Sequence, residues 1–143
     1  MDLIHSDVLG PFKTGLDGSR FLVTFLYDVT QLSVTYYIKS KANVFDCFRN
    51  FKQHYERPDR KIYRLRANNG REYISKAMLR YLFLTGITPE FTVPGNPQQN
   101  STTEKLGHII WNKAKTFLKL SSLPWEYWPE MVRTANYVRI RTP

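Results

Sequence analysis

Cysteine is almost absent from this chain, since Cys47 is the only one among 143 residues. A single cysteine excludes a disulfide within the chain and any zinc site with two or more cysteine ligands. Histidine is scarce too, and the three histidines stand far apart, at positions 5, 54 and 108. A zinc-binding module is therefore not expected.

Long apolar runs, internal repeats and linker-like stretches are also missing. No segment reaches the roughly 18 consecutive apolar residues that a membrane-spanning helix needs, so we expect no membrane partner. The first residues show no basic stretch followed by an apolar run, so we expect no secretory signal. A chain of 143 residues fits one domain, over residues 1–143, with one hydrophobic core.

Acidic residues are the minority among the charged residues: 12 Asp and Glu oppose 21 Lys and Arg, which leaves a formal net charge of +9. Such a surplus favours a polyanionic partner, because binding releases the partner's counterions. Seven of the basic residues fall between Arg49 and Arg66, against two acidic ones, Glu56 and Asp59. We interpret this cluster as a sign of nucleic-acid binding, although a basic protein without such a partner could share the composition.

Hydrophobic periodicity predicts the order of elements in the first part of the chain. Short β-rich and alternating stretches predict strands at residues 3–8, 21–27 and 33–38. We expect these strands to form an antiparallel meander with one buried face. From Val44 the apolar spacing changes to three and four residues, which predicts an amphipathic helix that ends before Pro58.

The rest of the chain predicts strands and helices in alternation, followed by two helices. The expected elements are a strand at 62–67, a helix from about Ser75 to Gly86, a strand at 87–91, a polar loop at 92–100, and helices at about 102–120 and 124–139. In the helix that begins near Ser75 we expect four inward-facing residues, Met78, Leu79, Leu82 and Phe83. The sum is an α/β fold, a mixed sheet of about five strands flanked by helices.

Three short strings carry the most specific signal: HSDVLGP at residues 5–11, RANNGREY at 66–73 and PQQNSTTE at 97–104. Their order and spacing closely resemble the integrase catalytic core of copia-type LTR retrotransposons. The resemblance covers nearly the whole chain and implies an RNase H-like fold, in which three metal ligands meet at one end of the sheet. It also implies action in the nucleus and the formation of homo-oligomers.

In the family that this chain resembles, two Asp and one Glu bind Mg²⁺ or Mn²⁺ for DNA end processing and strand transfer. Asp7 matches the first Asp and Glu104 matches the Glu. Asn68 stands at the second Asp, in a string that otherwise matches the family's Asp-Asn-Gly-x-Glu-Tyr. The 35 residues between Asn68 and Glu104 give the spacing for which the family's acidic triad is named. The implied partners are the DNA ends of the element and a target DNA.

Asn68 keeps the shape of Asp and one carbonyl acceptor, but it removes a full negative charge from the expected metal site. We therefore expect weaker metal binding and impaired catalysis, although Asn carbonyls can bind Mg²⁺ and Ca²⁺. Other interpretations stay open: Asn68 as a turn residue, Asp7 as an ordinary strand-end residue, and Glu104 as part of a capping box with Ser101. Glu72 or Asp28 could also replace the missing charge.

Further departures from the family pattern follow Glu104, at Lys105, Gly107 and His108, and precede it at Ser101. A designed single inactivation would leave these positions alone, so natural decay or domestication is favoured over engineering. Five basic residues are candidates for DNA contact: Lys105, His108, Lys115, Arg64 and Arg66. Each could equally be a solvated surface residue.

The three tryptophans are expected in two different environments. We expect Trp128 in the core, and Trp111 and Trp125 are candidates for a subunit interface, where aromatic residues are enriched.

Two hypotheses of different class follow. The first is an integrase catalytic core whose chemistry Asn68 impairs. The second is a domesticated, non-enzymatic DNA-binding or assembly domain that keeps the fold. An unrelated metal nuclease is a third interpretation, which the spacing of the triad disfavours.

Overall fold

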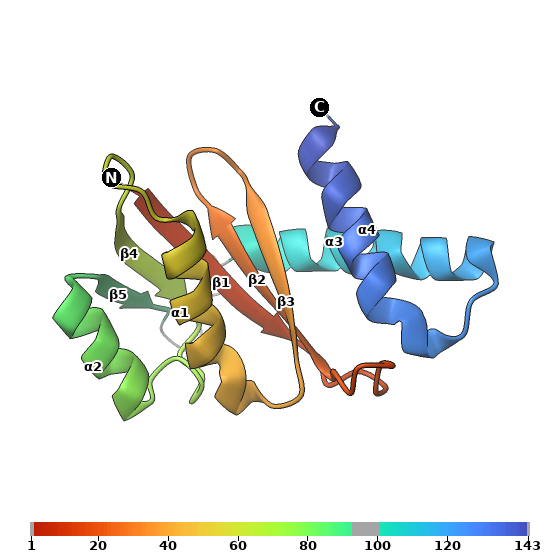
Figure 1. The fold of residues 1–143 in the computed structure, drawn as a ribbon, viewed down its shortest axis with the longest axis horizontal. Helices are drawn as coiled ribbons and strands as arrows, with labels where there is room; N and C mark the ends of the chain where they lie inside the picture. The colour runs from red at the N-terminus through yellow and green to blue at the C-terminus, as the bar shows by residue number, and fades with distance from the viewer. Residues whose placement is uncertain (1, 93–100, 143) are drawn as a thin grey trace.

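The computed structural model describes residues 2–92 and 101–142, so most of the loop expected at 92–100 lies outside the described residues (Figure 1). The elements in chain order are β1 (Asp2–Leu9), β2 (Phe21–Tyr27), β3 (Ser33–Ile38), the 3-10 turn η1 (Lys41–Asn43), α1 (Val44–Tyr55), β4 (Ile62–Ala67), α2 (Lys76–Thr85), β5 (Thr88–Phe91), α3 (Ser101–Ser121), the 3-10 turn η3 (Trp125–Tyr127) and α4 (Trp128–Arg141). Among the helices of residues 2–92 and 101–142, none combines the length and the hydropathy that a membrane-spanning segment requires.

The five strands form one mixed sheet in the order β3-β2-β1-β4-β5. β1, β2 and β3 pair antiparallel, whereas β4 pairs parallel with β1 and β5 pairs parallel with β4. The predicted sheet of about five strands and the predicted meander are therefore confirmed. In this register Asp7 lies opposite Thr24 of β2, and His5 lies opposite Arg66 of β4.

Apolar side chains fill both sides of the sheet. On one side α1 and α2 cover a core that includes Val23, Phe25 and Leu65. On the other side α3 and α4 cover Leu22 and Leu26 of β2. The expectation of one buried face is thus wrong for β2, because the last two helices return across the first three strands and bury the second face as well.

Helix α2 begins and ends where its sequence predicts. The Ser75 hydroxyl accepts a hydrogen bond from the backbone N–H of Met78, and Gly86 closes the helix at φ 74°, a conformation that favours glycine. Met78 and Leu82 are fully buried, but Leu79 is 39% exposed and Phe83 is 84% exposed. The prediction that Leu79 and Phe83 face inward is wrong. Helix α2 lies at the β5 edge of the sheet (Figure 1), so it buries only a narrow stripe of side chains.

The C-terminal helix starts later than predicted. Pro124 precedes the turn η3, and α4 begins at Trp128. Trp128 is fully buried, as expected, and its indole N–H donates to the Lys13 carbonyl at 2.8 Å.

Trp111 and Trp125 also pack within this chain. Trp111 stacks on Phe12 with ring centroids 4.2 Å apart, and Trp125 meets Trp111 edge to face at 5.5 Å. Both rings therefore have partners in the same chain and remain partly exposed, and their use in a subunit interface stays a prediction.

Candidate functional site

Asp7 lies near the C-terminal end of β1, on the side of the sheet that faces α3, and its residue surface is only 6% exposed. Burial raises the pKa of Asp7 to about 7, because the charged form loses its hydration. The backbone N–H of Val8 lowers this pKa, the charges of Glu104 and Glu72 raise it, and the charge of Lys41 lowers it. Asp7 is thus a buried carboxyl group that a nearby cation would favour in its charged form.

Asn68 follows the last residue of β4 directly and begins the turn that leaves the strand. Its side-chain carbonyl accepts a hydrogen bond from the backbone N–H of Gly70 at 2.9 Å, which is a turn of the kind that Asn commonly makes. The interpretation of Asn68 as a turn residue therefore describes its present contact. The carbonyl oxygen keeps a second lone pair that this bond does not use.

Gly70 lets the side chains of Asn68 and Glu72 approach each other. A Cβ at position 70 would lie 2.7 Å from Oε2 of Glu72 and 2.8 Å from Oδ1 of Asn68. Both oxygens therefore converge on the space that the missing side chain leaves. Any larger residue at this position would push the two groups apart.

Glu104 lies in the first turn of α3 and is exposed. A carboxylate is stabilised there by the partial positive charge of the helix N-terminus. The close approach of α3 to β1 brings Glu104 toward Asp7: a Cβ at Gly107 would lie only 3.0 Å from Cδ1 of Leu9. The side chain of Ser101 lies outside the described part, so the capping box stays a prediction.

The structure thus gathers side-chain oxygens that could serve as metal ligands at one end of the sheet. Asp7 lies within electrostatic range of Glu72 and Glu104, and the Asn68 carbonyl lies beside Glu72. Hard oxygens of this kind are the ligands that divalent cations such as Mg²⁺ prefer. Within residues 2–92 and 101–142, however, no three His, Cys, Asp or Glu side chains lie close enough to hold a metal ion together. The donor chemistry fits a divalent cation, whereas a closed set of ligands is not preformed in this part.

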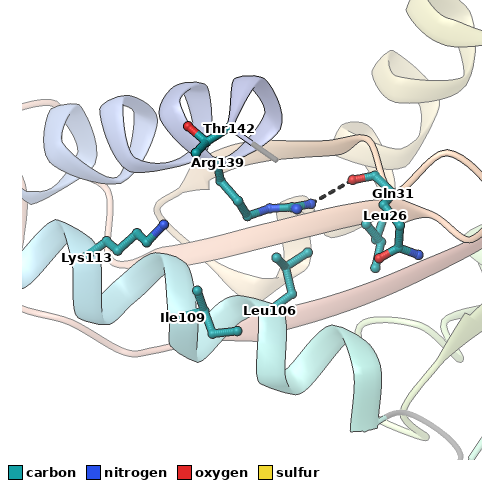
Figure 2. A pocket seen from close by; sticks show the side chains of 7 residues that line it. All are labelled: Leu26, Gln31, Leu106, Ile109, Lys113, Arg139 and Thr142. Atoms are coloured by element: carbon teal, nitrogen blue, oxygen red, sulfur yellow. Dashed lines mark hydrogen bonds between the residues drawn. The ribbon is translucent and has the colours of Figure 1, made fainter.

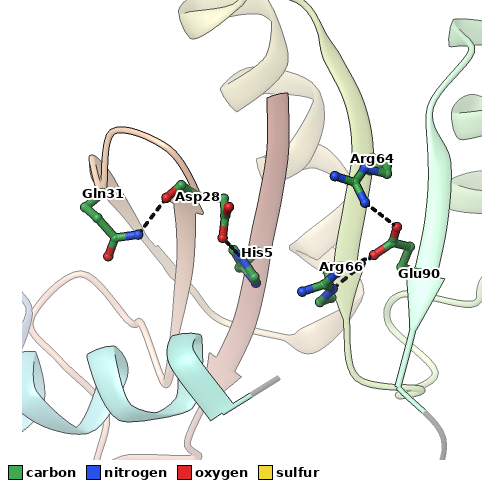
Figure 3. A network of polar contacts seen from close by, with 6 residues as sticks. All are labelled: His5, Asp28, Gln31, Arg64, Arg66 and Glu90. Atoms are coloured by element: carbon green, nitrogen blue, oxygen red, sulfur yellow. Dashed lines mark hydrogen bonds and ion pairs between the residues drawn. The ribbon is translucent and has the colours of Figure 1, made fainter. Parts of the chain in front are cut away.

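Glu72 and Asp28, the two acidic residues that could replace the charge missing at Asn68, lie in different parts of the structure. Glu72 lies beside Asn68, as described above. Asp28 follows β2 and accepts a hydrogen bond from Nε2 of His5 at 2.7 Å (Figure 3). Its backbone N–H donates to the carbonyl of Leu3, four residues before Asp7, so Asp28 lies toward the other end of β1. Of the two acids, only Glu72 shares the sheet end with Asn68.

The three predicted DNA contacts on α3 are exposed. By helix geometry, His108 and Lys115 share a stripe with Glu104, and Lys115 lies about 16 Å from it along the axis. Lys105 lies about a quarter turn further round. Leu106, Ile110, Ala114 and Leu118 are buried in the apolar cluster that α3 shares with α4 and β2.

Most basic residues of the cluster between Arg49 and Arg66 are paired with acidic side chains. Five of its seven members form ion pairs: Arg49 with Asp46, Lys52 with Glu56, Arg60 with Asp2, and both Arg64 and Arg66 with Glu90. The cluster is also spread over α1, the following turn and β4. It therefore does not form one continuous surface of unpaired charge.

Two residues near Asp7 were not among the predicted site residues. Lys41 is exposed in η1, which follows β3, and its charge lowers the pKa of Asp7. Tyr73 is fully buried, and its hydroxyl lies 2.7 Å from that of Ser6. Neither position has a local sequence signal of this role, because both depend on how distant segments meet.

A pocket of about 430 Å³ lies between α3, α4 and the turn after β2 (Figure 2). Its lining residues are Leu26, Gln31, Leu106, Ile109, Lys113, Arg139 and Thr142. Arg139 spans it and donates to the Gln31 carbonyl at 2.7 Å. None of the predicted metal or DNA residues lines this pocket, so it is separate from the oxygen ligands around Asp7.

Comparison with known sequences finds relatives over the full length of the chain. The chain is 39% identical to a retrovirus-related Pol polyprotein from transposon TNT 1-94 of Nicotiana tabacum, with 100% of the chain and 11% of the relative covered. It is 31% identical to the corresponding polyprotein from transposon RE2 of Arabidopsis thaliana, with 100% of the chain and 10% of the relative covered. The chain thus spans about one tenth of these relatives. No family model matches the sequence.

Solved structures show the same fold at low sequence identity. The catalytic core domain of BIV integrase matches with a TM-score of 0.68 and 17% identity over 94% of this chain and 80% of that chain. The HTLV-2 integrase catalytic core domain in complex with magnesium, in a trimeric form, matches with a TM-score of 0.68 and 13% identity over 94% and 82%. The predicted RNase H-like fold is therefore confirmed.

Proposed function

Since this chain is an integrase catalytic core-like domain homologous to part of the Pol polyproteins of copia-type transposons, we propose that it binds DNA and keeps an impaired form of integrase chemistry. The ancestral reaction is metal-dependent processing of DNA ends and their transfer to a target strand. One observation carries the proposal: Glu104 lies near enough to Asp7 for its charge to raise the pKa of Asp7, and the neutral Asn68 matches the position of the family's second Asp.

The charge at this end of the sheet sets the chemistry. Bound there, a divalent cation would polarise a phosphodiester and stabilise the charge that develops on its oxygens. Asp7 and Glu104 would hold the cation with full negative charges. Asn68 would add only a neutral carbonyl, which in this structure accepts a hydrogen bond from the backbone N–H of Gly70. Two carboxylates neutralise the charge of two divalent cations less well than three carboxylates do. The loss of charge at position 68 should therefore weaken the binding of two cations at once more than the binding of one.

The basic residues around this end of the sheet would contact DNA and not the metal. Lys41, Lys105 and His108 are exposed near Asp7 or Glu104, where they would attract and orient the phosphates of a DNA strand. The net charge of +9 strengthens this attraction at long range. DNA binding in this proposal therefore survives the loss of catalysis.

The test compares the natural protein with Asn68→Asp in Mg²⁺ and in Mn²⁺. Strand transfer is measured with labelled DNA ends, and metal binding is measured by calorimetry. We expect negligible transfer by the natural protein and tighter metal binding by Asn68→Asp. Asn69→Asp is the matched control, because it adds the same charge at the next, exposed position. Robust transfer by the natural protein would contradict the proposal of impaired catalysis.

The second candidate is a domesticated DNA-binding or assembly domain without catalysis. Gly107 favours it, because this departure from the family pattern lies where α3 contacts Leu9, close to the start of the helix that carries Glu104. If Asn68→Asp binds metal tightly but still transfers no DNA, the segment after Glu104 has lost its role and the second candidate stands.

A further inference from the structure

Arg64, Arg66 and Glu90 form an ion-pair network across β4 and β5 (Figure 3). Nη1 of Arg64 donates to Oε1 of Glu90 at 2.9 Å. Nε and Nη2 of Arg66 donate to Oε2 of Glu90 at 3.0 and 2.8 Å. One carboxylate thus holds two guanidinium groups.

This network lies on a part of the sheet that the helices leave partly open. Side chains alternate along β4, so Arg64 and Arg66 point away from Leu65 and Ala67, which are buried in the core under α1 and α2. On the arginine side, the described apolar cluster under α3 and α4 takes strand residues from β1, β2 and β3 only. The side chains of Arg64 and Arg66 accordingly remain 36% and 29% exposed.

The network continues from the oxygen ligands described above. Arg66 lies opposite His5 of β1, and Asp7 is the next residue of β1 on the same face. Strand geometry puts the Cα atoms of Arg66 and Asp7 about 8 Å apart. Asn68 follows Arg66 by two residues, so Asn68, Arg66 and Arg64 form a row that leads away from the sheet end.

The network has donors and positive charge in excess. Burial pushes the pKa of Glu90 upward, but hydrogen bonds from Arg66 and Arg64 outweigh it and hold that pKa below its usual value, so Glu90 is ionised. Two arginines against one carboxylate leave one positive charge. Two guanidinium groups carry about ten N–H donors, of which three bind Glu90.

We propose that the backbone of a DNA strand docks on Arg64 and Arg66, and that Glu90 is the internal counter-ion that a phosphate must displace. The proposal rests on the proposed DNA binding. It adds the place where the DNA backbone binds and a residue, Glu90, that competes with the DNA for that place. A phosphate presents oxygens to a guanidinium in the same paired geometry as a carboxylate, so it can take the place of Glu90 without rearranging the arginines. Glu90 then weakens DNA binding until the strand is in place.

The test is a mutant cycle read out by fluorescence anisotropy with a short labelled DNA duplex at several salt concentrations. Glu90→Gln frees both arginines and should tighten binding. Glu130→Gln is the control, because it removes the same charge from the Glu130–Arg133 pair on the exposed side of α4. We expect Glu90→Gln to tighten binding about fivefold more than Glu130→Gln does. In an Arg64→Gln, Arg66→Gln background, Glu90→Gln should have no more effect than the control.

Equal effects of Glu90→Gln and Glu130→Gln would overturn the inference, as would a Glu90→Gln effect that persists without the arginines. Thermal unfolding shows whether each variant folds. If the double glutamine variant does not fold, Arg64→Lys with Arg66→Lys keeps the charge and removes the paired geometry, and it should lose most of the gain from Glu90→Gln. Salt-independent or absent binding by the natural protein would instead refute the proposed DNA binding itself.

Discussion

The hydroxyl groups of Ser6 and Tyr73 lie 2.7 Å apart, and both side chains are fully buried. Ser6 immediately precedes Asp7, and Tyr73 ends the segment that begins at Asn68. This one contact therefore ties the strand that carries Asp7 to the turn that carries Asn68, without using either of them.

Removing the Tyr73 hydroxyl should destabilise the protein. Tyr73→Phe leaves the buried Ser6 hydroxyl without this partner, which should lower the free energy of unfolding by about 1–2 kcal/mol. Urea denaturation measures the change. Tyr63→Phe is the control, because Tyr63 is 45% exposed on β4, and its effect should stay below about 0.5 kcal/mol. Equal losses in the two variants would contradict the structural role of the Ser6–Tyr73 contact.

The raised pKa of Asp7 predicts a pH-dependent stability in metal-free buffer. The folded protein keeps the Asp7 proton up to a pH near 7, whereas the unfolded chain releases it near 3.8. The folded state binds more protons in this window, so the contribution of Asp7 to stability falls as pH rises from about 4 to about 7. Asp7→Asn should therefore stabilise the protein at pH 8, by roughly 2–4 kcal/mol.

Urea denaturation of Asp7→Asn from acidic to alkaline pH, with a chelator present, checks this expectation. Asp46→Asn is the control, because Asp46 is exposed on α1 in a pair with Arg49. A natural protein that gains stability across this window relative to Asp7→Asn would show that Asp7 is already held in its charged form.

Gly70→Ala should weaken metal binding by separating Asn68 from Glu72. The added methyl group would lie under 3 Å from an oxygen of each side chain, so both must move. In the Asn68→Asp background we expect the Mg²⁺ affinity to fall roughly tenfold by calorimetry. Asn69→Ala in the same background should leave the affinity unchanged. Unaltered binding by Gly70→Ala would mean that the residues around position 70 do not reach the metal.

Lysines on α3 should contribute to DNA binding according to their position. Lys105→Gln and Lys115→Gln should each weaken binding and lower the slope of log affinity against log salt by about one. Lys119→Gln, near the C-terminal end of the same helix, should change both quantities less. If all three variants behave alike, the helix attracts DNA only through net charge and makes no specific phosphate contact.

Local sequence signals predicted the elements well where neighbouring residues decide the outcome. The bounds of β2 and β4 match the prediction, and Ser75 and Gly86 mark the ends of α2 because their cap geometry is local. Phe83 was misplaced, since its exposure depends on how far α2 extends over the sheet edge. The second buried face of β2 was also missed, because it depends on α3 and α4, which begin far later in the chain, at Ser101 and Trp128.

The candidate site was predictable only through its resemblance to a family. That resemblance selected Asp7, Asn68 and Glu104, which stay predicted ligands. The nearness of Glu72 to Asn68 and the pairing of Arg64 and Arg66 with Glu90 could not be predicted, since they depend on a glycine turn and on the parallel register of β4 and β5. Composition alone suggested a free basic surface where the structure has ion pairs.

The aromatic cluster of α3 and α4 has a practical consequence for spectroscopy. All three tryptophans belong to it, so tryptophan fluorescence, excited selectively over tyrosine, observes only the layer on one side of the sheet. Trp111 lies two turns after Glu104 on the same stripe of α3, which makes it a built-in reporter of ligands that arrive at the start of that helix. A change in tryptophan emission on adding DNA or Mg²⁺ would therefore come from this layer. Helices α1 and α2 contain no tryptophan and would not contribute to it.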